Sequence, residues 1–314
     1  TVYYRAQAPV AQLDRALPSE GRGHRFKSYR VRQLACLKKM QVHRVGLFQR
    51  KSTAVLTTLL LSFTATAQAT DSPTIASTSL CGDSYLLALA SDHISALSWQ
   101  SRSPLSRAND AQKQLPQLWD DPEMLLTTEA DYILFGAGEG VKVKALPAKP
   151  LNLIWGEDFE TLFSNTKMIE DALALETDTS QNWGRRIEAL TRKSKKRGSL
   201  PKILYLSRSG GSAGQGTLVG AAITAAGGIN IAEASGWFTP DPEQIIAYKP
   251  DLIITSYFKN GYESVQSTAV RNRAVQRFIE SRPNTEIDGN LWPCAGPGLI
   301  EAAERISDAI DKLP

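Results

Sequence analysis

The sequence predicts an α/β fold of two Rossmann-like lobes, each with a parallel sheet, joined by one long connecting helix. In two regions, apolar runs of strand length alternate with amphipathic stretches of helix length, which is typical of parallel sheets covered by helices. Between these regions, nearly forty residues without proline keep an approximately helical apolar spacing. We therefore expect a ligand cleft between the two lobes.

Two stretches that lie 120 residues apart are near copies of one another. Asp121–Leu134 and Asp241–Ile254 share five identical positions, and three further positions exchange leucine for isoleucine. Each copy starts with Asp-Pro-Glu, the order expected of a helix N-cap, a first helical residue and a first turn. An apolar run of strand length then follows. The repeat indicates a duplicated architecture, although chance similarity between two ordinary helix–strand units is an alternative.

The remaining elements follow from the same patterns. In the first lobe, residues 70–157, we expect strands at Thr74–Leu80, Ile94–Trp99 and Pro150–Trp155, and a helix at Ser84–Ala90. In the second lobe, residues 199–314, we expect a strand at Lys202–Leu206 and helices at Thr217–Ala226, Gln266–Glu280 and Leu299–Leu313. The connecting helix falls within residues 158–198, with a possible break near Thr177–Ser180. Because a continuous helix bends less easily than loop hinges, it predicts a small closing motion.

The first 39 residues do not read as folded protein. They have no sustained apolar period, and pieces rich in arginine and glycine dominate them. The run Ala11–Phe26 resembles a peptide that appears when a transfer-RNA gene is translated by mistake. We therefore expect synthesis to start at Met40, with a disordered basic arm as the alternative.

Residues 40–69 have the order of a secretory signal peptide. A basic start precedes a short apolar core at Ala54–Phe63, and Ala67-Gln68-Ala69 fits a small-residue cleavage site. The basic residues of the start are His43, Arg44, Arg50 and Lys51. The apolar core is shorter than the ~20 residues of a membrane span. We expect cleavage near Ala69 and an exported mature protein that begins near Thr70.

The charge distribution argues against a nucleic-acid partner. Residues 1–69 hold 12 of the 36 Lys and Arg residues but only 2 of the 32 Asp and Glu residues. The body therefore keeps 24 basic and 30 acidic residues, whereas nucleic-acid binders normally carry a basic face. The basic run Arg192–Arg197 is interpreted as a solvated helix end.

Catalytic and metal-binding patterns are weak. The mature chain has one histidine, His93, and two cysteines, Cys81 and Cys294, which form neither a metal-ligand cluster nor a disulfide framework. The cysteines are interpreted as small buried or cleft residues, with a disulfide as the less favoured alternative. The glycine-rich loop Ser209–Thr217 lacks the lysine of a P-loop and the glycine spacing of a dinucleotide site. The sequence therefore predicts a non-enzyme without a metal or cofactor of its own.

Aromatic residues at predicted strand ends and in loops are better candidates for a function. Trp119 lies four residues before Glu123, and Trp237 lies six residues before Glu243, so a tryptophan precedes each copy of the repeat. Facing aromatic side chains on two lobes would form a slot for a large planar or apolar ligand. About half of the aromatic residues must belong to the core. The candidate ligand-binding residues are Trp99, Trp119, Arg208, Trp237, Phe238, Tyr257 and Trp292.

This combination of features resembles the periplasmic binding proteins of iron-chelate and vitamin B12 ABC importers. The exported leader, the two lobes and the connecting helix all match, over most of residues 73–312. The strongest similarity lies in the two repeat copies and in Gly211–Leu218 through Ala225–Ala232.

The resemblance implies roles for four residues. In that family a glutamate on each lobe docks onto arginines of the membrane permease, and the matching residues are Glu123 and Glu243. Exposed carboxylates at equivalent places can form bidentate pairs with arginine, although both glutamates could instead only stabilise helix N-termini. In the vitamin B12 binder, tryptophans just before these glutamates line the pocket, and Trp119 and Trp237 correspond to them. Leu80–Ser84 departs from the family's usual Thr-Glu pair, so the resemblance leaves the ligand open.

The resemblance thus implies an exported, monomeric substrate-binding component of an ABC importer that captures a metal chelate and delivers it to a permease. A cobalamin-like corrinoid is the favoured ligand, and a ferric siderophore or haem comes next. The alternatives are a chelatase-like enzyme or a metallochaperone on the same two-lobed scaffold, and a ligand sensor for a signalling partner.

Overall fold

The computed structural model describes residues 72–140, 143–176, 178–256 and 272–314. The expected leader, the signal peptide and Tyr257 lie outside these ranges, as does the first part of the helix expected at Gln266–Glu280. The described residues belong to one compact unit. Within the described ranges, no helix is both long enough and apolar enough to span a bilayer.

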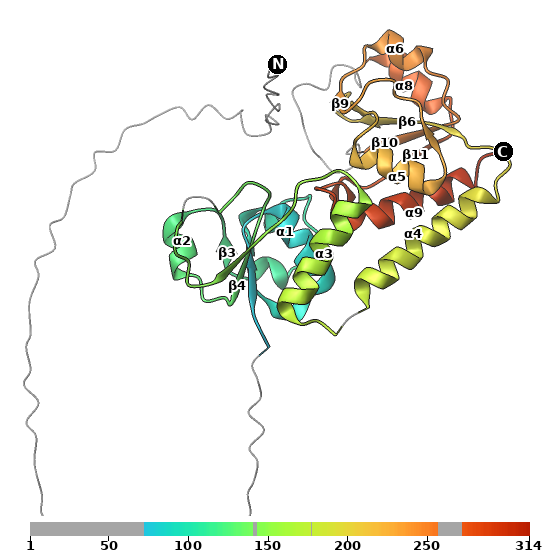
Figure 1. Ribbon diagram of the computed structural model, residues 1–314. Coiled ribbons are helices and arrows are strands. Elements are labelled where there is room, and N and C mark those ends of the chain that lie inside the picture. The colour runs from blue at the N-terminus through green and yellow to red at the C-terminus, as the bar shows by residue number, and fades with distance from the viewer. Residues whose placement is uncertain (1–71, 141–142, 177, 257–271) are drawn as a thin grey trace, which may run out of the picture. The chain divides into compact units, whose positions relative to one another are not determined.

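The first lobe is built on a five-stranded parallel sheet in the order β3-β2-β1-β4-β5. Figure 1 labels β3 and β4 of this sheet together with α1 and α2. Alternate residues of its central strands point to opposite faces. Ile75 and Leu134 enter one hydrophobic core, whereas Ala76 and Ile133 enter another, so both faces of the sheet are covered as predicted. The elements are β1 Ile75–Ser77, α1 Leu80–Leu89, β2 Ile94–Ser98, β3 Gln117–Leu118, α2 Pro122–Thr127, β4 Tyr132–Phe135 and β5 Lys149–Asn152.

The second lobe contains a four-stranded parallel sheet in the order β11-β10-β6-β8 and an antiparallel ribbon of β7 and β9. Its sheet is also covered on both faces, because Ile203 and Ile254 enter one core while Leu204 and Ile253 enter another. The elements are β6 Lys202–Ser207, β7 Ser212–Ala213, α5 Leu218–Ala226, β8 Ile229–Asn230, β9 Trp237–Phe238, α6 Pro242–Ala247, β10 Leu252–Ser256, α8 Arg273–Glu280, β11 Asn284–Glu286 and α9 Gly298–Ile310.

Helix α1 begins earlier than the sequence pattern indicated. The strand expected at Thr74–Leu80 ends at Ser77, and the helix expected from Ser84 begins at Leu80. The reason is the N-cap: the Ser79 hydroxyl accepts a hydrogen bond from the Gly82 N–H at 3.1 Å. The glycine and the cysteine of the first turn therefore belong to the helix.

The expectation of one continuous connecting helix is wrong. The segment forms two helices, α3 Phe159–Leu173 and α4 Thr179–Lys195, and Ala174 adopts the left-handed conformation between them with φ 49°. The Glu170 carboxylate of α3 accepts hydrogen bonds from the backbone N–H and the hydroxyl of Ser180, at 3.1 and 2.8 Å. One side chain thus stabilises the first turn of α4, and the break lies close to the place given as the alternative.

The preference for unpaired cysteines is also wrong. Cys81 of α1 and Cys294 of the segment before α9 form a disulfide, with their Cα atoms 5.6 Å apart. The Tyr85 hydroxyl donates a hydrogen bond to the Ala295 carbonyl beside it, at 2.7 Å. A single hydrophobic core contains residues of both lobes and of α3 and α4. Covalent, polar and apolar contacts therefore all join the first lobe to the second.

Candidate functional site

The carboxyl edge of the first sheet presents two neighbouring tryptophans. β2 and β3 pair in parallel, with Ser98 opposite Leu118, and Trp99 and Trp119 are the next residue of each strand. The side chain of Gln117 donates a hydrogen bond to the Trp99 carbonyl at 3.4 Å. Trp99 is 58% exposed and Trp119 is 42% exposed, which is unusual for such large apolar side chains. The edge thus carries two exposed tryptophans, each directly after one of two paired strands.

A buried carboxyl group forms hydrogen bonds with the last residue of β2, directly before Trp99. Asp83 of α1 accepts hydrogen bonds from the Ser98 backbone N–H at 2.9 Å and from the Ser98 hydroxyl at 2.6 Å. Burial raises the pKa of Asp83 to about 6, although the hydrogen bonds from Ser98 act in the opposite direction. Asp83 therefore fixes the end of β2 directly before Trp99.

A third exposed tryptophan follows β5 at the same edge. Trp155 is 71% exposed. The buried side chain of Asn165 in α3 holds its neighbour Ile154, accepting from the Ile154 N–H at 2.8 Å and donating to its carbonyl at 3.1 Å. Parallel strands direct their carboxyl ends to one edge of the sheet, which is where ligands bind in open α/β folds. Trp155 was not among the candidate ligand-binding residues.

In the second lobe, the β7–β9 ribbon carries Trp237 and Phe238. Ala213 pairs with Trp237, and Ser212 pairs with Phe238. Trp237 is 51% exposed, whereas Phe238 is half-buried. Arg208 directly follows β6, and its backbone N–H donates to the Ser256 carbonyl at 3.0 Å, so it lies at the carboxyl edge of this sheet.

Trp237 is held in place by a residue that the sequence did not single out. Its indole N–H lies 3.2 and 3.1 Å from the two carboxylate oxygens of Glu157, in the segment between β5 and α3. Its ring packs edge-on against Tyr205 of β6, with centroids 6.3 Å apart. A single glutamate between a strand and a helix carries no sequence signal that would have revealed this contact.

Trp292 lies in the core rather than at an accessible surface. It is 4% exposed, packs edge-on against Tyr205 with centroids 5.8 Å apart, and donates its indole N–H to the Ser256 hydroxyl at 2.8 Å. Its position gives no support to the expected ligand contact, and it belongs to the half of the aromatic residues that build the core. Tyr257, outside the described residues, stays a prediction.

The two candidate docking glutamates occupy equivalent places. Glu123 and Glu243 are exposed in the first turns of α2 and α6. One turn later, Leu126 is 53% exposed and Ile246 is 43% exposed. Residues three apart are neighbours on a helix surface. Each short helix therefore offers a carboxylate beside an exposed aliphatic side chain.

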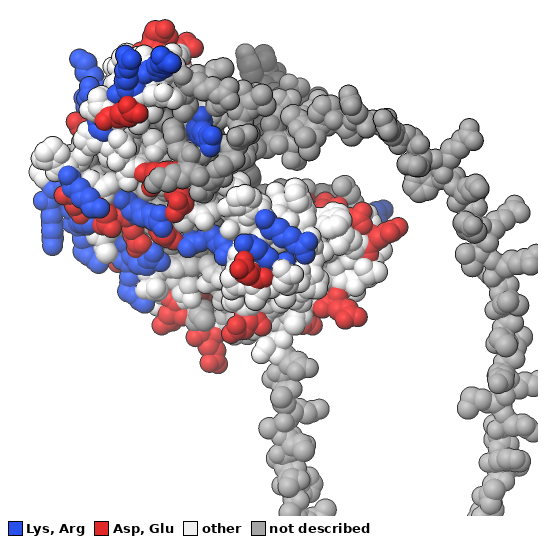
Figure 2. Space-filling view, turned by 180° about the vertical axis from the view of Figure 1, so that it is seen from behind, with Lys and Arg blue, Asp and Glu red and all other residues white. Residues whose placement is uncertain are grey.

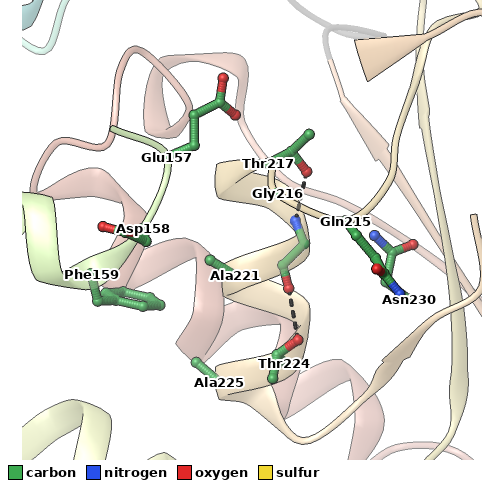
Figure 3. Close-up of a pocket in the computed structure, with 11 residues that line it drawn as sticks. Glu157, Asp158, Phe159, Gln215, Gly216, Thr217, Ala221, Thr224, Ala225 and Asn230 are labelled. Carbon is green, nitrogen blue, oxygen red and sulfur yellow. Dashed lines mark hydrogen bonds between the residues drawn. The ribbon is translucent and has the colours of Figure 1, made fainter. Parts of the chain in front are cut away.

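An open pocket of about 620 Å³ lies between the start of α3 and helix α5 (Figure 3). Phe159 lies opposite Ala221 and Ala225 across it. Two of its polar side chains already have partners: the Thr224 hydroxyl donates to the Gly220 carbonyl at 2.9 Å, and the Asn230 amide donates to the Ala213 carbonyl at 2.9 Å. None of the candidate aromatic residues lines this pocket, so we do not assign the ligand to it.

Charged groups in the described ranges form ion pairs rather than a metal centre. No group of three or more His, Cys, Asp or Glu side chains there is arranged to hold a metal ion. Figure 2 shows basic and acidic side chains mixed over one face. Lys193 pairs with Asp308 at 3.2 Å and with Asp311, and Arg197 pairs with Asp311 at 2.7 Å. These pairs agree with a solvated helix end and give no support to a nucleic-acid patch.

Comparisons with known proteins find similarity in structure rather than in sequence. No protein-family model matches the chain, and no curated protein matches it. The periplasmic haem-binding protein HutB of Vibrio cholerae is 20% identical with a TM-score of 0.61, covering 76% of this chain and 98% of its own. A periplasmic haem-binding protein of Pseudomonas aeruginosa is 18% identical with a TM-score of 0.56, covering 76% and 92%. The periplasmic vitamin B12 binding protein BtuF of Vibrio cholerae is 18% identical with a TM-score of 0.54, covering 76% and 96%.

These solved proteins share the architecture that the sequence predicted. Their similarity covers nearly the whole of each of them, so it includes both lobes of this chain and not one α/β unit alone. The chain therefore has the two-lobed α/β fold of periplasmic substrate-binding proteins, the family that its sequence resembles.

Proposed function

We propose that the protein is the exported substrate-binding component of an ABC importer and captures a metal chelate in the periplasm. The observation that carries this proposal is the pair of carboxyl edges. Exposed tryptophans follow β2, β3 and β5 at the first edge, and another exposed tryptophan lies on the ribbon beside the second sheet. Exposed aromatic side chains on two lobes suit a large planar or apolar ligand, whose faces can stack on them. Capture requires no catalytic group, so the protein acts as a carrier.

A cobalamin-like corrinoid is the favoured ligand, and haem or a ferric siderophore comes next. A haem iron is usually held by a side chain such as histidine or tyrosine. Among the described residues, His93 directly precedes β2, where its Nδ1 lies 2.7 Å from the Pro73 carbonyl, away from the carboxyl edges. The carboxyl edges instead offer Trp99, Trp119 and Trp237, which can stack on the faces or edges of a macrocycle. Haem-binding proteins with the same fold support haem as the second candidate.

A tryptophan-quenching titration against cyanocobalamin, hemin and several ferric siderophores tests this proposal. We expect one class to quench at micromolar concentration or below, and Trp119→Ala and Trp237→Ala each to weaken binding about tenfold or more. Trp183→Phe is the matched control, because Trp183 is buried in α4, and it should bind as the wild type does. Absence of binding to every chelate, or undiminished binding by both alanine variants, would contradict the proposal.

Delivery is proposed to use the two short helices of the repeat. Glu123 and Glu243 would pair with arginines of an inner-membrane permease, and the exposed aliphatic residue beside each would add an apolar contact. The duplicated arrangement fits a partner that presents the same surface twice. The protein itself would act as a monomer.

Uptake of the chelate by cells that lack the wild-type gene tests delivery. We expect Glu123→Ala with Glu243→Ala to abolish uptake while chelate binding by the purified protein stays unchanged. Glu129→Ala with Glu233→Ala is the control, since it removes one exposed carboxylate from each lobe outside the docking helices. Normal uptake by the first double variant would show that the glutamates only stabilise helix N-termini. The chelatase and metallochaperone alternatives gain no support from the described side chains.

A further inference from the structure

The indole of Trp237 is fixed at two of its edges although half of its surface is exposed. The N–H edge lies 3.1–3.2 Å from both carboxylate oxygens of Glu157. Another side meets the buried ring of Tyr205, which in turn packs on the buried Trp292. An unrestrained side chain on a two-residue strand would sample several rotamers. The two restraints leave one orientation, with the rest of the ring facing solvent.

Glu157 makes a second contact that fixes its own position. Its Oε2 atom accepts the backbone N–H of Leu218, the first residue of α5, at 3.0 Å. This N–H has no partner within the helix, and a carboxylate at a helix N-terminus is favoured by the helix dipole. The side chain therefore joins Trp237 to the rigid end of α5.

The backbone around Glu157 is also constrained. Asp158 caps α3 by accepting the Thr161 N–H at 2.8 Å. Gly156 lies so close to Thr161 that a Cβ atom there would come within 1.9 Å of the Thr161 hydroxyl oxygen. The chain can make this approach only because residue 156 has no side chain. The segment that carries Glu157 is thus held against the first turn of α3 (Figure 3).

We propose that Glu157 is a positioning residue that holds the Trp237 indole in the orientation in which it contacts the ligand. This inference rests on the proposed function, because it takes Trp237 as a ligand contact. Glu157 acts through Trp237 and need not touch the ligand. A residue that precedes α3, far from the β7–β9 ribbon in sequence, therefore sets the geometry of the second lobe's binding surface.

Glu157→Gln is the informative variant. Glutamine keeps the size of the side chain but removes its negative charge and replaces one acceptor oxygen with an NH2 donor. Its remaining oxygen can still accept from both the indole N–H and the Leu218 N–H, but these hydrogen bonds are no longer charge-assisted, and the NH2 group faces the indole N–H donor against donor. We expect a weakening of ligand binding of about tenfold, the equivalent of about 1.4 kcal/mol. Glu160→Gln is the matched control, because it removes an exposed carboxylate from the first turn of α3, and it should bind as the wild type does.

Two measurements separate positioning from a general structural role. The first is the indole N–H spectrum of ¹⁵N-tryptophan-labelled protein, in which Trp237→Phe assigns one of the six resonances. Loss of the carboxylate should move the Trp237 resonance and leave the buried Trp183 and Trp292 resonances in place. The second is a double-mutant cycle with hemin and cyanocobalamin, followed by the absorbance of the macrocycle. In the Trp237→Phe background, Glu157→Gln should change the Kd less than twofold.

The outcomes distinguish the inference from the proposed function. If the wild type binds a macrocycle but the Trp237 resonance does not move in Glu157→Gln, the positioning role is wrong. The same holds if Glu157→Gln weakens binding equally with and without the Trp237 indole. If the wild type binds neither hemin nor cyanocobalamin, the preference for a macrocycle in the proposed function is wrong, and a displaced Trp237 resonance would still support the restraint of Trp237 by Glu157.

Discussion

The two lobes share one arrangement of strands and helices, which we call the frame, and they differ at the carboxyl edges of their sheets. The strand order β2-β1-β4-β5 in the first lobe corresponds to β8-β6-β10-β11 in the second, and α1 and α5 occupy equivalent places in the chain. The eleventh residue of each repeat, an aspartate, makes the same kind of hydrogen bond in both lobes. Asp131 accepts the Thr74 N–H at 2.8 Å, and Asp251 accepts the Lys202 N–H at 2.7 Å, so each aspartate holds the entry to the neighbouring strand.

The carboxyl edges of the two sheets carry their tryptophans on different elements. The first lobe places Trp99 and Trp119 directly after neighbouring strands. The second lobe inserts the β7–β9 ribbon and places Trp237 on it. The elements that the two lobes share carry the buried cores, whereas the inserted and edge residues are the ones that we propose to recognise the ligand. Residues of the frame should therefore matter for folding in both lobes alike, and edge residues should matter for binding.

Removal of the disulfide is the strongest test of how far the lobes depend on one another. Cys81→Ala with Cys294→Ala should lower the free energy of unfolding by about 4 kcal/mol, because a closed loop of more than 200 residues is released in the unfolded state. Urea denaturation followed by tryptophan fluorescence would measure it, with the reduced wild type as control. We also expect the transition to broaden as the lobes begin to unfold separately. A loss below about 1 kcal/mol would contradict this expectation.

The contacts between the two lobes give a new reason to expect a small closing motion. The continuous helix that first suggested it is absent, because α3 and α4 are separate. The disulfide, the Tyr85–Ala295 hydrogen bond and the shared core now supply the reason. Small-angle scattering with and without chelate should show little change in the radius of gyration, and a large compaction would contradict the role of these contacts.

The fifth residue of each repeat tests the equivalence of the frames. Leu125 and Ile245 are buried, at 0% and 1% exposure, and anchor helices of only six residues. Leu125→Ala and Ile245→Ala should each cost about 3 kcal/mol, the usual range for emptying such a site. The exposed neighbours, changed to alanine, should cost less than about 0.5 kcal/mol. A marked difference between Leu125→Ala and Ile245→Ala in denaturant unfolding would show that only one lobe uses the helix as part of its frame.

Much of the frame could be predicted because its elements follow from patterns of neighbouring residues. Capping residues, strand-length apolar runs and the spacing of Asp121 and Asp241 all act over a few residues or repeat at a fixed distance. The duplicated topology followed from them. The solvated end of α4 could be predicted in the same way.

The errors concern contacts between residues far apart in the sequence. Nothing near Cys81 indicates that Cys294 lies within bonding distance, because tertiary packing brings the two together. Glu170 binds Ser180 across the break between α3 and α4, and Glu157 binds Trp237, which lies 80 residues further along the chain. Trp292 was predicted to contact the ligand because it lies in a loop. It is buried instead, with a hydrogen bond to the Ser256 hydroxyl and a ring contact with Tyr205. Such pairs have no local signature.

Asp83 distinguishes the two lobes by pH. It is the fourth residue of α1, and the equivalent residue of α5 is Ala221. Burial raises the pKa of Asp83 to about 6, above its usual 3.8, so the native state binds this proton more tightly than the unfolded state does. The contribution of Asp83 to stability is therefore lost as the pH rises from about 4 through about 6, at most about 3 kcal/mol.

The variant Asp83→Asn should lack this loss. Relative to the wild type, its free energy of unfolding should rise by up to about 3 kcal/mol between pH 4 and pH 7.5 in urea titrations. Asp92→Asn, an exposed carboxyl on the connection between α1 and β2, is the control. A difference between wild type and Asp83→Asn that stays constant with pH would show that Asp83 is ionised in the native protein throughout this range.

The sixth residue of each repeat should affect delivery without affecting stability. Leu126 and Ile246 are exposed, so replacing both with serine should change the free energy of unfolding by less than about 0.5 kcal/mol and leave chelate binding unchanged. Uptake should nevertheless fall severalfold, because a partner that covers Glu123 and Glu243 also covers the aliphatic side chain one turn away. Leu200→Ser with Ile229→Ser, which changes aliphatic residues of similar exposure outside the repeat, should leave uptake normal. Equal uptake by both double variants would restrict the docking surface to the glutamates, and the two repeat helices would then share only their carboxylates as a common function.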